Sequence, residues 1–401
     1  MGDLTITTFM WLLLLAFAVS LFVEKLNIPY APALAITGLV AGMFPVLTNA
    51  TLSPHMLLNI LLPPLLFEGA LHLRASSLRH DMFPVAVLAT IGTVAAAFAT
   101  AWVMRKLLYL PWAACLTFGC LISATDPISV IALFRRIGAP SRLTLIIEAE
   151  SLFNDGMAAA LYMAAIGSLR SGGALTAASI GVPLLIGALG GGAVGAGLGW
   201  LSSRIHSRLD DHLMDLTLTT LLVYGSYEIA TALGVSGVIA VIAAGLVAGN
   251  TGLFGTMTEK ARESVLAFWE FAAFIANSLV FLLVGFTAAH YHWLNMPKVV
   301  LVAIVSVLVG RLTVYPLLWM SNRASTEVPR GWRHVLWWGG LRGALSMALA
   351  LALPSSFPDR SKLVAAAFGV VVFSLVVQGL TVGRLVTGLN IHAPSVDPAK
   401  P

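Results

Sequence analysis

The stretch from Gly119 to Phe134 reads GCLISATDPISVIALF, and Pro127 stands in the middle of this apolar run. Proline lacks a backbone N–H, and its ring clashes with the carbonyl group four residues earlier, here that of Ser123. We therefore expect a helix to break around Thr125 and Asp126. Backbone groups freed at membrane depth are tolerated where they line a hydrated cavity or bind an ion, and oxygen ligands suit hard cations. The alternative is a simple proline kink with the acid satisfied by a neighbour.

The composition is that of an integral membrane protein. Of the 401 residues, 58% are hydrophobic and only 10% are charged, whereas a soluble domain has about 25% charged residues. A helix needs about 20 apolar residues to cross a ~30 Å hydrocarbon layer, and such runs recur along the chain. We expect an all-α protein with a single transmembrane domain, residues 1–388, and a short polar tail, residues 389–401.

Apolar runs separated by polar breaks predict about 13 transmembrane helices. The spans are 4–23, 30–47, 55–73, 82–104, 111–134, 141–168, 174–203, 211–233, 235–250, 261–288, 297–319, 332–353 and 362–388. The least marked boundary is the one at Gly234, between the eighth and ninth spans.

The basic residues predict the orientation. With the N-terminus outside, the loops on the inner side hold 14 of the 23 Lys and Arg residues, the outer loops hold six, and three lie within spans. Cytoplasmic loops carry the excess of positive charge, so we expect the N-terminus outside and the C-terminus in the cytoplasm. The first span follows MGD, which has no basic residue, so we expect it to be a helix and not a cleaved signal peptide.

Six charged residues lie roughly nine to fifteen residues deep in their spans, where each costs about 2.5 to 3.5 kcal/mol to insert. They are Glu68, Asp126, Glu150, Asp155, Arg311 and Arg342. We expect them to form a polar layer near the middle of the membrane.

A second break is expected in WWGGLRGALSMALAL, residues 337–351, where three glycines surround Arg342. The fifth and twelfth spans run in opposite directions, because their positions in the order differ by an odd number. Interrupted helices of opposite direction are typical of inverted-topology repeats that cross at a midplane site.

The sixth span contains EAESLFNDGMAAALY, residues 148–162. Glu150 and Asn154 are four residues apart and share one face of the helix, and Ser151 and Asp155 share the adjacent face. Asp155, next to Ser151 and the first break, could supply oxygen ligands to a dehydrated cation.

Glu150 needs a permanent positive partner to stay ionised in a low dielectric. Our choice is Arg311, in VLVGRLTVYP, with Arg342 as the alternative. Glu68 follows Pro63 and Pro64, and could hold the charge of the site or line the ion path. For Glu228 and Glu270, which have no companion motif, we expect a structural or dimer-contact role.

Enzyme chemistry is poorly supported. The chain has no H-E-x-x-H motif and no cysteine cluster, which argues against a metal enzyme. A hydrolase that uses Ser151 or Ser346 would need a paired base, and none is visible at helical spacing. The G-x-G-x-x-G match from Gly190 to Gly195 has no preceding strand and is better explained by close helix packing.

Five segments together resemble the monovalent cation:proton antiporters, in the electroneutral sodium/proton exchanger (NhaP/NHE-like) branch. These are FEGALHL, SATDPISVIALF, EAESLFNDGMAAALY, VGRLTVYP and GGLRGALSMALALALP. The resemblance implies a homodimer of thirteen-helix protomers in the cell membrane. It also implies a scaffold, about 1–73 and 174–288, and a moving core, about 82–168 and 297–388.

The resemblance implies roles for the site residues. Asp155 would bind the ion or the proton, and Asn154 would be its motif partner. The supporting residues would be Thr125, Asp126, Ser151 and Ser123, with Asp155, Thr125 and Ser151 as Na⁺ ligands. Glu150 and Arg311 would form a structural ion pair. Arg342 would neutralise the carbonyl ends of the broken helices, unless it faces Glu150.

The predicted activity is exchange of one Na⁺, or Li⁺, for one H⁺ at a single site that opens alternately to each side. A carboxylate that holds either a proton or a cation couples the two fluxes by mutual exclusion. Because Asn154 is neutral in both states, we expect electroneutral exchange. No cofactor, nucleic acid or ATP is implied, and the expected partners are the ions, membrane lipids and a second copy. A K⁺/H⁺ antiporter and, with less support, a cation channel remain alternatives.

Overall fold

Helices make up the described part of this computed structural model, which comprises residues 6–26, 29–44, 53–170, 176–206, 211–253 and 257–391, and no strand occurs within these ranges. The first half of the chain contains α1 (Ile6–Leu26), α2 (Tyr30–Gly42), α3 (Leu62–His72), α4 (Ala75–Leu78), α5 (Met82–Val87), α6 (Thr93–Leu108), α7 (Trp112–Ile122), α8 (Ile128–Ile137), α9 (Ser141–Arg170) and α10 (Ala177–His206). The second half contains α11 (His212–Ala232), α12 (Gly237–Val247), α13 (Glu259–His290), α14 (Pro297–Arg311), α15 (Val314–Ala324), α16 (Arg330–Trp338), α17 (Ala344–Leu351), α18 (Arg360–Phe373) and α19 (Gly379–Gly388).

Short segments of other helical geometry extend several of these helices. Four are π-helical, namely η2 (Met56–Leu61), η3 (Leu88–Gly92), η4 (Ala248–Leu253) and η6 (Ser374–Gln378), and η5 (His292–Asn295) is a 3₁₀ turn. Each predicted span coincides with a helical segment, and the fourth span, for example, is α5, η3 and α6 in succession.

The boundary at Gly234 is confirmed, because this residue has a φ of 74° in the turn between α11 and α12. The second span was expected to reach residue 47, but α2 ends at Gly42, and residues 45–47 lie outside the described ranges. The expected polar tail is also outside them from residue 392 onward.

Six helical stretches are long and apolar enough to cross a membrane by length and composition. They are Met82–Leu108, Ser141–Leu169, Ala178–His206, Glu259–His290, Pro297–Ala324 and Arg360–Gly388. Shorter apolar helices accompany them, at Thr7–Val23, Tyr30–Gly42, Met56–His72, Trp112–Ile122 and Gly237–Gly252. The fold is therefore that of a multi-span, all-helical membrane protein.

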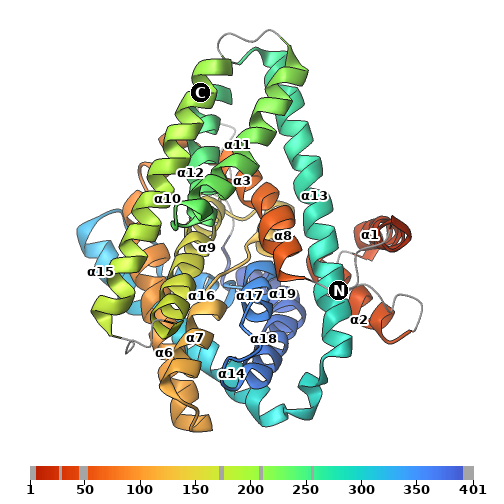
Figure 1. Ribbon diagram of the computed structural model, residues 1–401. Helices are drawn as coiled ribbons and strands as arrows, with labels where there is room; N and C mark the ends of the chain where they lie inside the picture. The colour runs from red at the N-terminus through yellow and green to blue at the C-terminus, as the bar shows by residue number, and fades with distance from the viewer. Residues whose placement is uncertain are drawn as a thin grey trace.

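Glycines let several helix pairs approach closely. In Figure 1 the long helix α13 runs down one side of the molecule with α1 and α2 beside it, and α2 packs along α13. A Cβ atom at Gly285 would overlap the carbonyl oxygen of Ala35, and one at Gly195 in α10 would overlap that of Ala240 in α12. Gly190 and Gly195 of the G-x-G-x-x-G match thus lie against neighbouring segments, as predicted, whereas the third glycine, Gly192, has open space beside it.

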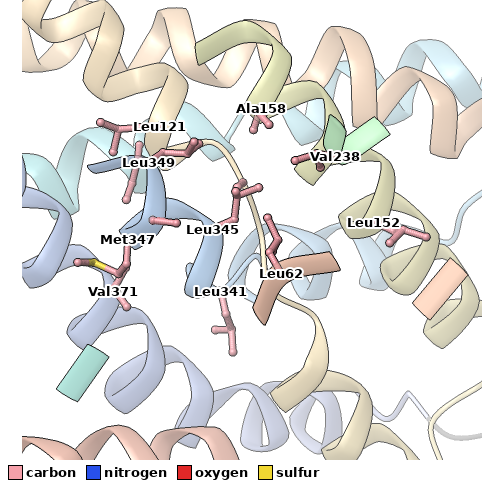
Figure 2. Packing of buried hydrophobic residues seen from close by; sticks show 14 of the residues in the cluster. Leu62, Leu121, Leu152, Ala158, Val238, Leu341, Leu345, Met347, Leu349 and Val371 are labelled. Atoms are coloured by element: carbon pink, nitrogen blue, oxygen red, sulfur yellow. The ribbon is translucent and has the colours of Figure 1, made fainter. Parts of the chain in front are cut away.

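The helix α9 lies among helices from both halves of the predicted division. It packs against α7 and also against α10 and α12. Figure 2 shows part of the continuous hydrophobic core around it, with labelled side chains from α3, α7, α9, α12, α17 and α18. The division into scaffold and core stays a prediction.

Both predicted interruptions are present. The first, residues 123–127, separates α7 from α8, and the second, residues 339–343, separates α16 from α17. The two interruptions touch, because the backbone N–H of Asp126 donates to the carbonyl oxygen of Leu341 at 2.8 Å. The site described next is built around this crossing.

Candidate functional site

Glycine is required where the two interruptions cross. A Cβ atom at Gly343 would overlap the side chain of Asp126, and one at Gly340 would lie 2.7 Å from Nε of Arg311. The side chain of Asp126 also accepts from the backbone N–H of Ile128 at 3.0 Å, which begins α8. At the crossing, Asp126 therefore packs directly against Gly343, between the start of α8 and the start of α17.

Arg342 joins the second interruption to the first. Its side chain is buried, with 2% of the residue exposed. Nη1 donates to the carbonyl oxygens of Ser123 at 2.5 Å and Ala124 at 3.0 Å, just beyond the end of α7. The backbone N–H of Arg342 donates to Oγ of Ser374 at 2.6 Å. A cation is favourable at the C-terminal end of a helix, where the carbonyl groups carry partial negative charge.

Glu150 pairs with Arg311 and not with Arg342. Nη1 and Nη2 of Arg311 donate to the two carboxylate oxygens at 2.8 and 3.1 Å, and only 1% of Glu150 and 7% of Arg311 are exposed. Arg311 also donates from Nε and Nη2 to the carbonyl oxygen of Leu336, near the end of α16. Such a bidentate, additionally bonded pair leaves no net charge buried at this point.

A chain of polar side chains links α9 to the first interruption. Asn154 donates from Nδ2 to Oγ1 of Thr125 at 3.1 Å and to Glu150 at 3.5 Å. The hydroxyl of Thr125 donates to Ser151 at 3.2 Å, and the hydroxyl of Ser151 donates to the carbonyl oxygen of Thr125. On the other side, Thr93 of α6 donates to Oδ1 of Asn154 at 3.0 Å. These contacts fix the rotamers around the interruption.

Asp155 takes no part in the hydrogen bonds just described. It lies one residue beyond Asn154 on α9, and its Oδ1 is buried with no hydrogen-bond partner among the described residues. The residue lines a cavity of about 460 Å³, together with Thr125, Asp126 and Ser346. The cavity is therefore bounded by the two interruptions and by two acids, Asp126 and Asp155, that form no ion pair with the described residues.

Further acids line the same cavity away from the crossing. These are Glu68 of α3, Glu148 of α9 and Glu270 of α13. Glu68 interacts with His72, whose Nδ1 lies 2.9 Å from the carbonyl oxygen of Glu68 and 3.2 Å from its carboxylate. The cavity extends to the exposed residues His72 and Arg135, at the ends of α3 and α8. The excess of carboxylates favours cations over anions in this space.

The predicted site residues thus occupy two kinds of position. Those that line the cavity are Asp155, Asp126, Thr125 and Glu68. The others, Ser151, Asn154, Ser123, Glu150, Arg311 and Arg342, are absent from its lining and lie behind or beside it. The hydroxyl of Ser123 points back to the carbonyl oxygen of Cys120 at 2.7 Å. Glu270, for which we expected a structural or dimer-contact role, lines the cavity.

Other polar residues of the site carry no motif that would have identified them. They are Thr93, Asn277 and Ser374, and their only sequence signal is a polar side chain inside an apolar run. Ser346 was considered only as a nucleophile, and its hydroxyl lies 3.4 Å from the carbonyl oxygen of Ala124. Within the described ranges no group of three or more His, Cys, Asp and Glu side chains is arranged to hold a metal ion. The oxygen atoms of the site come instead from carboxylate, hydroxyl, amide and backbone groups.

Comparison with known proteins gives consistent results. Residues 12–388 match the family described as sodium/hydrogen exchanger, transmembrane. The Na⁺/H⁺ antiporter NhaS2 of Synechocystis sp. is 38% identical over 400 residues, covering 98% of this chain and 73% of the relative. The antiporter NhaH of Halobacillus dabanensis is 36% identical over 95% of this chain and 97% of its own. The Na⁺/H⁺ antiporter NhaP of Pseudomonas aeruginosa is 38% identical, covering 85% of this chain and 82% of the relative.

Among solved structures, the sodium proton antiporter MjNhaP1 of Methanocaldococcus jannaschii at pH 8 has the same fold. The TM-score is 0.78 at 23% sequence identity, over 96% of this chain and 98% of that one. The fold, the family match over nearly the whole chain and the relatives above 30% identity agree. The chain belongs to the transmembrane sodium/hydrogen exchanger family, whose members are transporters and not enzymes.

Proposed function

We propose that this protein exchanges Na⁺ or Li⁺ for H⁺ across the membrane by alternating access. The observation that carries the proposal is the unpartnered Oδ1 of Asp155, buried at the edge of a cavity of about 460 Å³. Several relatives with 34 to 38% identity are named Na⁺/H⁺ antiporters, which supports the same reaction here. The transported ions are substrates, and no cofactor takes part.

Asp155 is the residue for which the cation and the proton compete. The cation binds to the ionised carboxylate with Thr125 as a further oxygen ligand, and protonation removes the negative charge that holds it. Ser151, expected as another ligand, does not line the cavity and supports Thr125 through its hydroxyl. Because both cannot be bound at once, movement of one ion in one direction requires movement of the other in return. Asp126 is a second acid in the lining, and its side chain accepts from the Ile128 N–H; one-for-one exchange requires that its charge does not change during the cycle.

The exchange is one cation for one proton and therefore electroneutral. Asn154, next to Asp155, is neutral in every state, and its oxygen and nitrogen are both bonded within the site. The charge of Glu150 is neutralised by its ion pair with Arg311. Among the acids of the cavity, Asp155 is the one that takes up and releases the proton in this proposal.

In the orientation with the N-terminus outside, the cavity opens to the cytoplasm. The loops next to the exposed ends His72 and Arg135 are then cytoplasmic, and the excess of positive charge in the inner loops supports this direction. In this proposal the protein acts as a homodimer in the cell membrane. A native mass measurement in detergent or nanodiscs that gives a single protomer would contradict the dimer.

The second candidate is K⁺/H⁺ exchange by the same mechanism, because the oxygen ligands around Asp155 suit either ion. A cation channel is disfavoured, since permanent conduction needs a continuous wet pore.

Purified protein in proteoliposomes tests the function. With a pH-sensitive dye inside, we expect Na⁺ and Li⁺ to dissipate an imposed ΔpH with saturable kinetics. A response to K⁺ alone would favour the second candidate, and non-saturating conductance would favour a channel. No cation-dependent proton flux would contradict the proposal.

A further inference from the structure

Two oxygen atoms on the lining residues of the cavity are buried and lack a hydrogen-bond partner in the described part of the chain. One is Oδ1 of Asp155 on α9, and the other is Oδ1 of Asn277 on α13. An unsatisfied buried polar group costs about 1 to 3 kcal/mol, so each such group in a native structure requires an explanation. For Asp155 the explanation is the transported ion, and Asn277 needs one of its own.

Asn277 lies in the apolar run FIANSLVFLLVGF, residues 274–286, and only 6% of the residue is exposed. The next residue shows how a polar group in this helix is normally satisfied. The hydroxyl of Ser278 lies 2.6 Å from the carbonyl oxygen of Phe274 and 2.9 Å from the hydroxyl of Tyr30. Asn277 makes no comparable bond through its oxygen, although it is similarly buried.

The two unpartnered oxygens come from separate helices. Asp155 comes from α9, beside the first interruption, whereas Asn277 comes from α13, one turn beyond Ala273 and Phe274, which also line the cavity. A cavity of about 460 Å³ has room for a cation with several hydration waters, because a water molecule takes up about 30 Å³ in the liquid. Both residues line this one space, so an ion inside the cavity can move between them.

An amide oxygen can recognise a cation without competing for the proton. It is a good ligand for hard cations, directly or through a hydration water. Unlike a carboxylate, it is neutral at every pH at which the protein works. A change at such a residue would therefore act on cation affinity and leave the proton affinity unaltered.

We propose that Asn277 binds the transported cation in the cavity, directly or through its hydration water, and positions it for transfer to Asp155. This inference rests on the proposed function. It assigns a cation ligand to α13, a helix that contains neither interruption, and makes Asn277 a determinant of cation affinity and selectivity.

The test is the kinetics of Asn277→Leu in proteoliposomes. Leucine has a similar size and cannot bind a cation, so we expect the KM for Na⁺ and Li⁺ to rise about tenfold, which corresponds to the loss of one hydrogen bond to a charged group. The maximal rate should stay within about twofold, and the dependence of exchange on pH at saturating Na⁺ should be unchanged. Asn277→Gln keeps the amide and should recover part of the affinity. If Asn277→Leu does not reach the membrane, Asn277→Ala replaces it.

Thr287→Val is the matched control. Thr287 lies on the same helix, its Oγ1 is also buried without a partner in the described ranges, and it does not line the cavity. Its KM for Na⁺ should equal that of the wild type. An equal rise of KM in Thr287→Val would mean that any polar loss in α13 disturbs the protein, and would overturn the inference. The inference would also be overturned if Asn277→Leu kept the wild-type KM for Na⁺ and raised the melting temperature, because the amide would then be an unpaired buried group with no ligand.

A binding measurement separates this inference from the proposed function. Na⁺ or Li⁺ should raise the melting temperature of the purified wild-type protein, and Asn277→Leu should need about tenfold more cation for the same rise. If the wild type exchanges ions and the variant matches it in both assays, the inference is wrong and the function stands. If the wild type exchanges nothing but its stabilisation by Na⁺ depends on Asn277, the function is wrong and the cation site stands.

Discussion

Two carboxylates on α9, Glu150 and Asp155, are five residues apart and have opposite surroundings. Glu150 is closed in, with both oxygens bonded to Arg311 and a further contact from Asn154. Asp155 borders the cavity with Oδ1 unpartnered in the described part of the chain. Glu150 thus forms a structural contact between helices, whereas Asp155, on the same helix, has an oxygen atom that none of the described residues binds.

The difference is that Glu150 is fully buried with a fixed partner, whereas Asp155 is only half-buried and lies beside the cavity. Both acids would be expensive to bury singly, but Glu150 is neutralised by a fixed cation, whereas Asp155 has no counter-ion in contact. The polar chain of Thr125, Ser151 and Asn154 reaches Glu150 through the amide of Asn154 and joins it to the first interruption. Mutations can test this division of roles.

The largest effect is expected from Asp155→Ala, which removes the open carboxylate. Cation-driven proton flux in proteoliposomes should be abolished, because neither ion has its binding group. The melting temperature and oligomeric state should remain near those of the wild type, since the carboxylate oxygen Oδ1 makes no bond that holds the fold.

The control for this variant is Glu263→Ala, which removes an exposed acid near the start of α13 that does not line the cavity. It should exchange ions at the wild-type rate. Near wild-type flux in Asp155→Ala would show that another acid is the transporting one.

The next largest effect concerns stability. Arg311→Ala strands the buried charge of Glu150, and breaking a buried pair from one side costs about 3 to 5 kcal/mol. The melting temperature of Arg311→Ala should fall accordingly. Adding Glu150→Gln removes the stranded charge and should recover part of the loss.

Recovery of the melting temperature should be incomplete. Arg311 also donates to the carbonyl oxygen of Leu336, and this bond is lost both in Arg311→Ala and in the double variant. A double variant whose destabilisation equals the sum of the two single losses would contradict the role of the pair. Chemical denaturation of all four proteins in the same detergent would measure this cycle.

A smaller loss is expected from Arg342→Gln. The side chain donates to the carbonyl oxygens of Ser123 and Ala124 and has no carboxylate in contact, so the change leaves acceptors and not a charge unpaired. Hydrogen bonds to charged groups contribute about 1.5 to 3 kcal/mol, and the fall in stability should be of this order. Arg330→Gln, at the exposed start of α16, should have no measurable effect in the same thermal assay. A larger loss for Arg342→Gln than for Arg311→Ala would reverse the ranking of the two arginines.

The smallest expected effect is that of the membrane potential. A potential acts with about 2.3 kcal/mol per elementary charge per 100 mV, but one-for-one exchange moves no net charge. In proteoliposomes with a K⁺ diffusion potential set by valinomycin, the equilibrium ΔpH should not change, provided that K⁺ is first found not to be a substrate. A shift with the imposed voltage would mean that a second group besides Asp155 releases a proton.

The helical architecture could be predicted from the sequence because its signals are local. Pro127 removes a donor within its own helix, and the glycines around Arg342 weaken theirs, so each interruption is encoded where it occurs. The π-helical segments were not predicted. In η2 the missing N–H groups of Pro63 and Pro64 free earlier carbonyls, and the carbonyl of Ile60 accepts from the hydroxyl of Tyr224 at 3.3 Å.

The contacts between distant segments could be predicted only in part. The need of Glu150 for a cation follows from its depth, but the choice between Arg311 and Arg342 depends on how the helices pack. Thr93 and Asn277 belong to no motif, and nothing near them in the sequence tells which side of the helix faces the site. Their positions are a property of the tertiary structure.

The crossing of the interruptions is closed by the main chain, through the N–H of Asp126 and the carbonyl oxygen of Leu341. A bond of this kind is indifferent to the side chain at position 341, so that position can accept other apolar residues. The crossing is sensitive instead to the number of residues in this segment. One inserted or deleted residue between Gly340 and Gly343 would move Gly343 away from Asp126 and the guanidinium of Arg342 away from the end of α7. We therefore expect this segment to vary by exchange of residues and never by change of length.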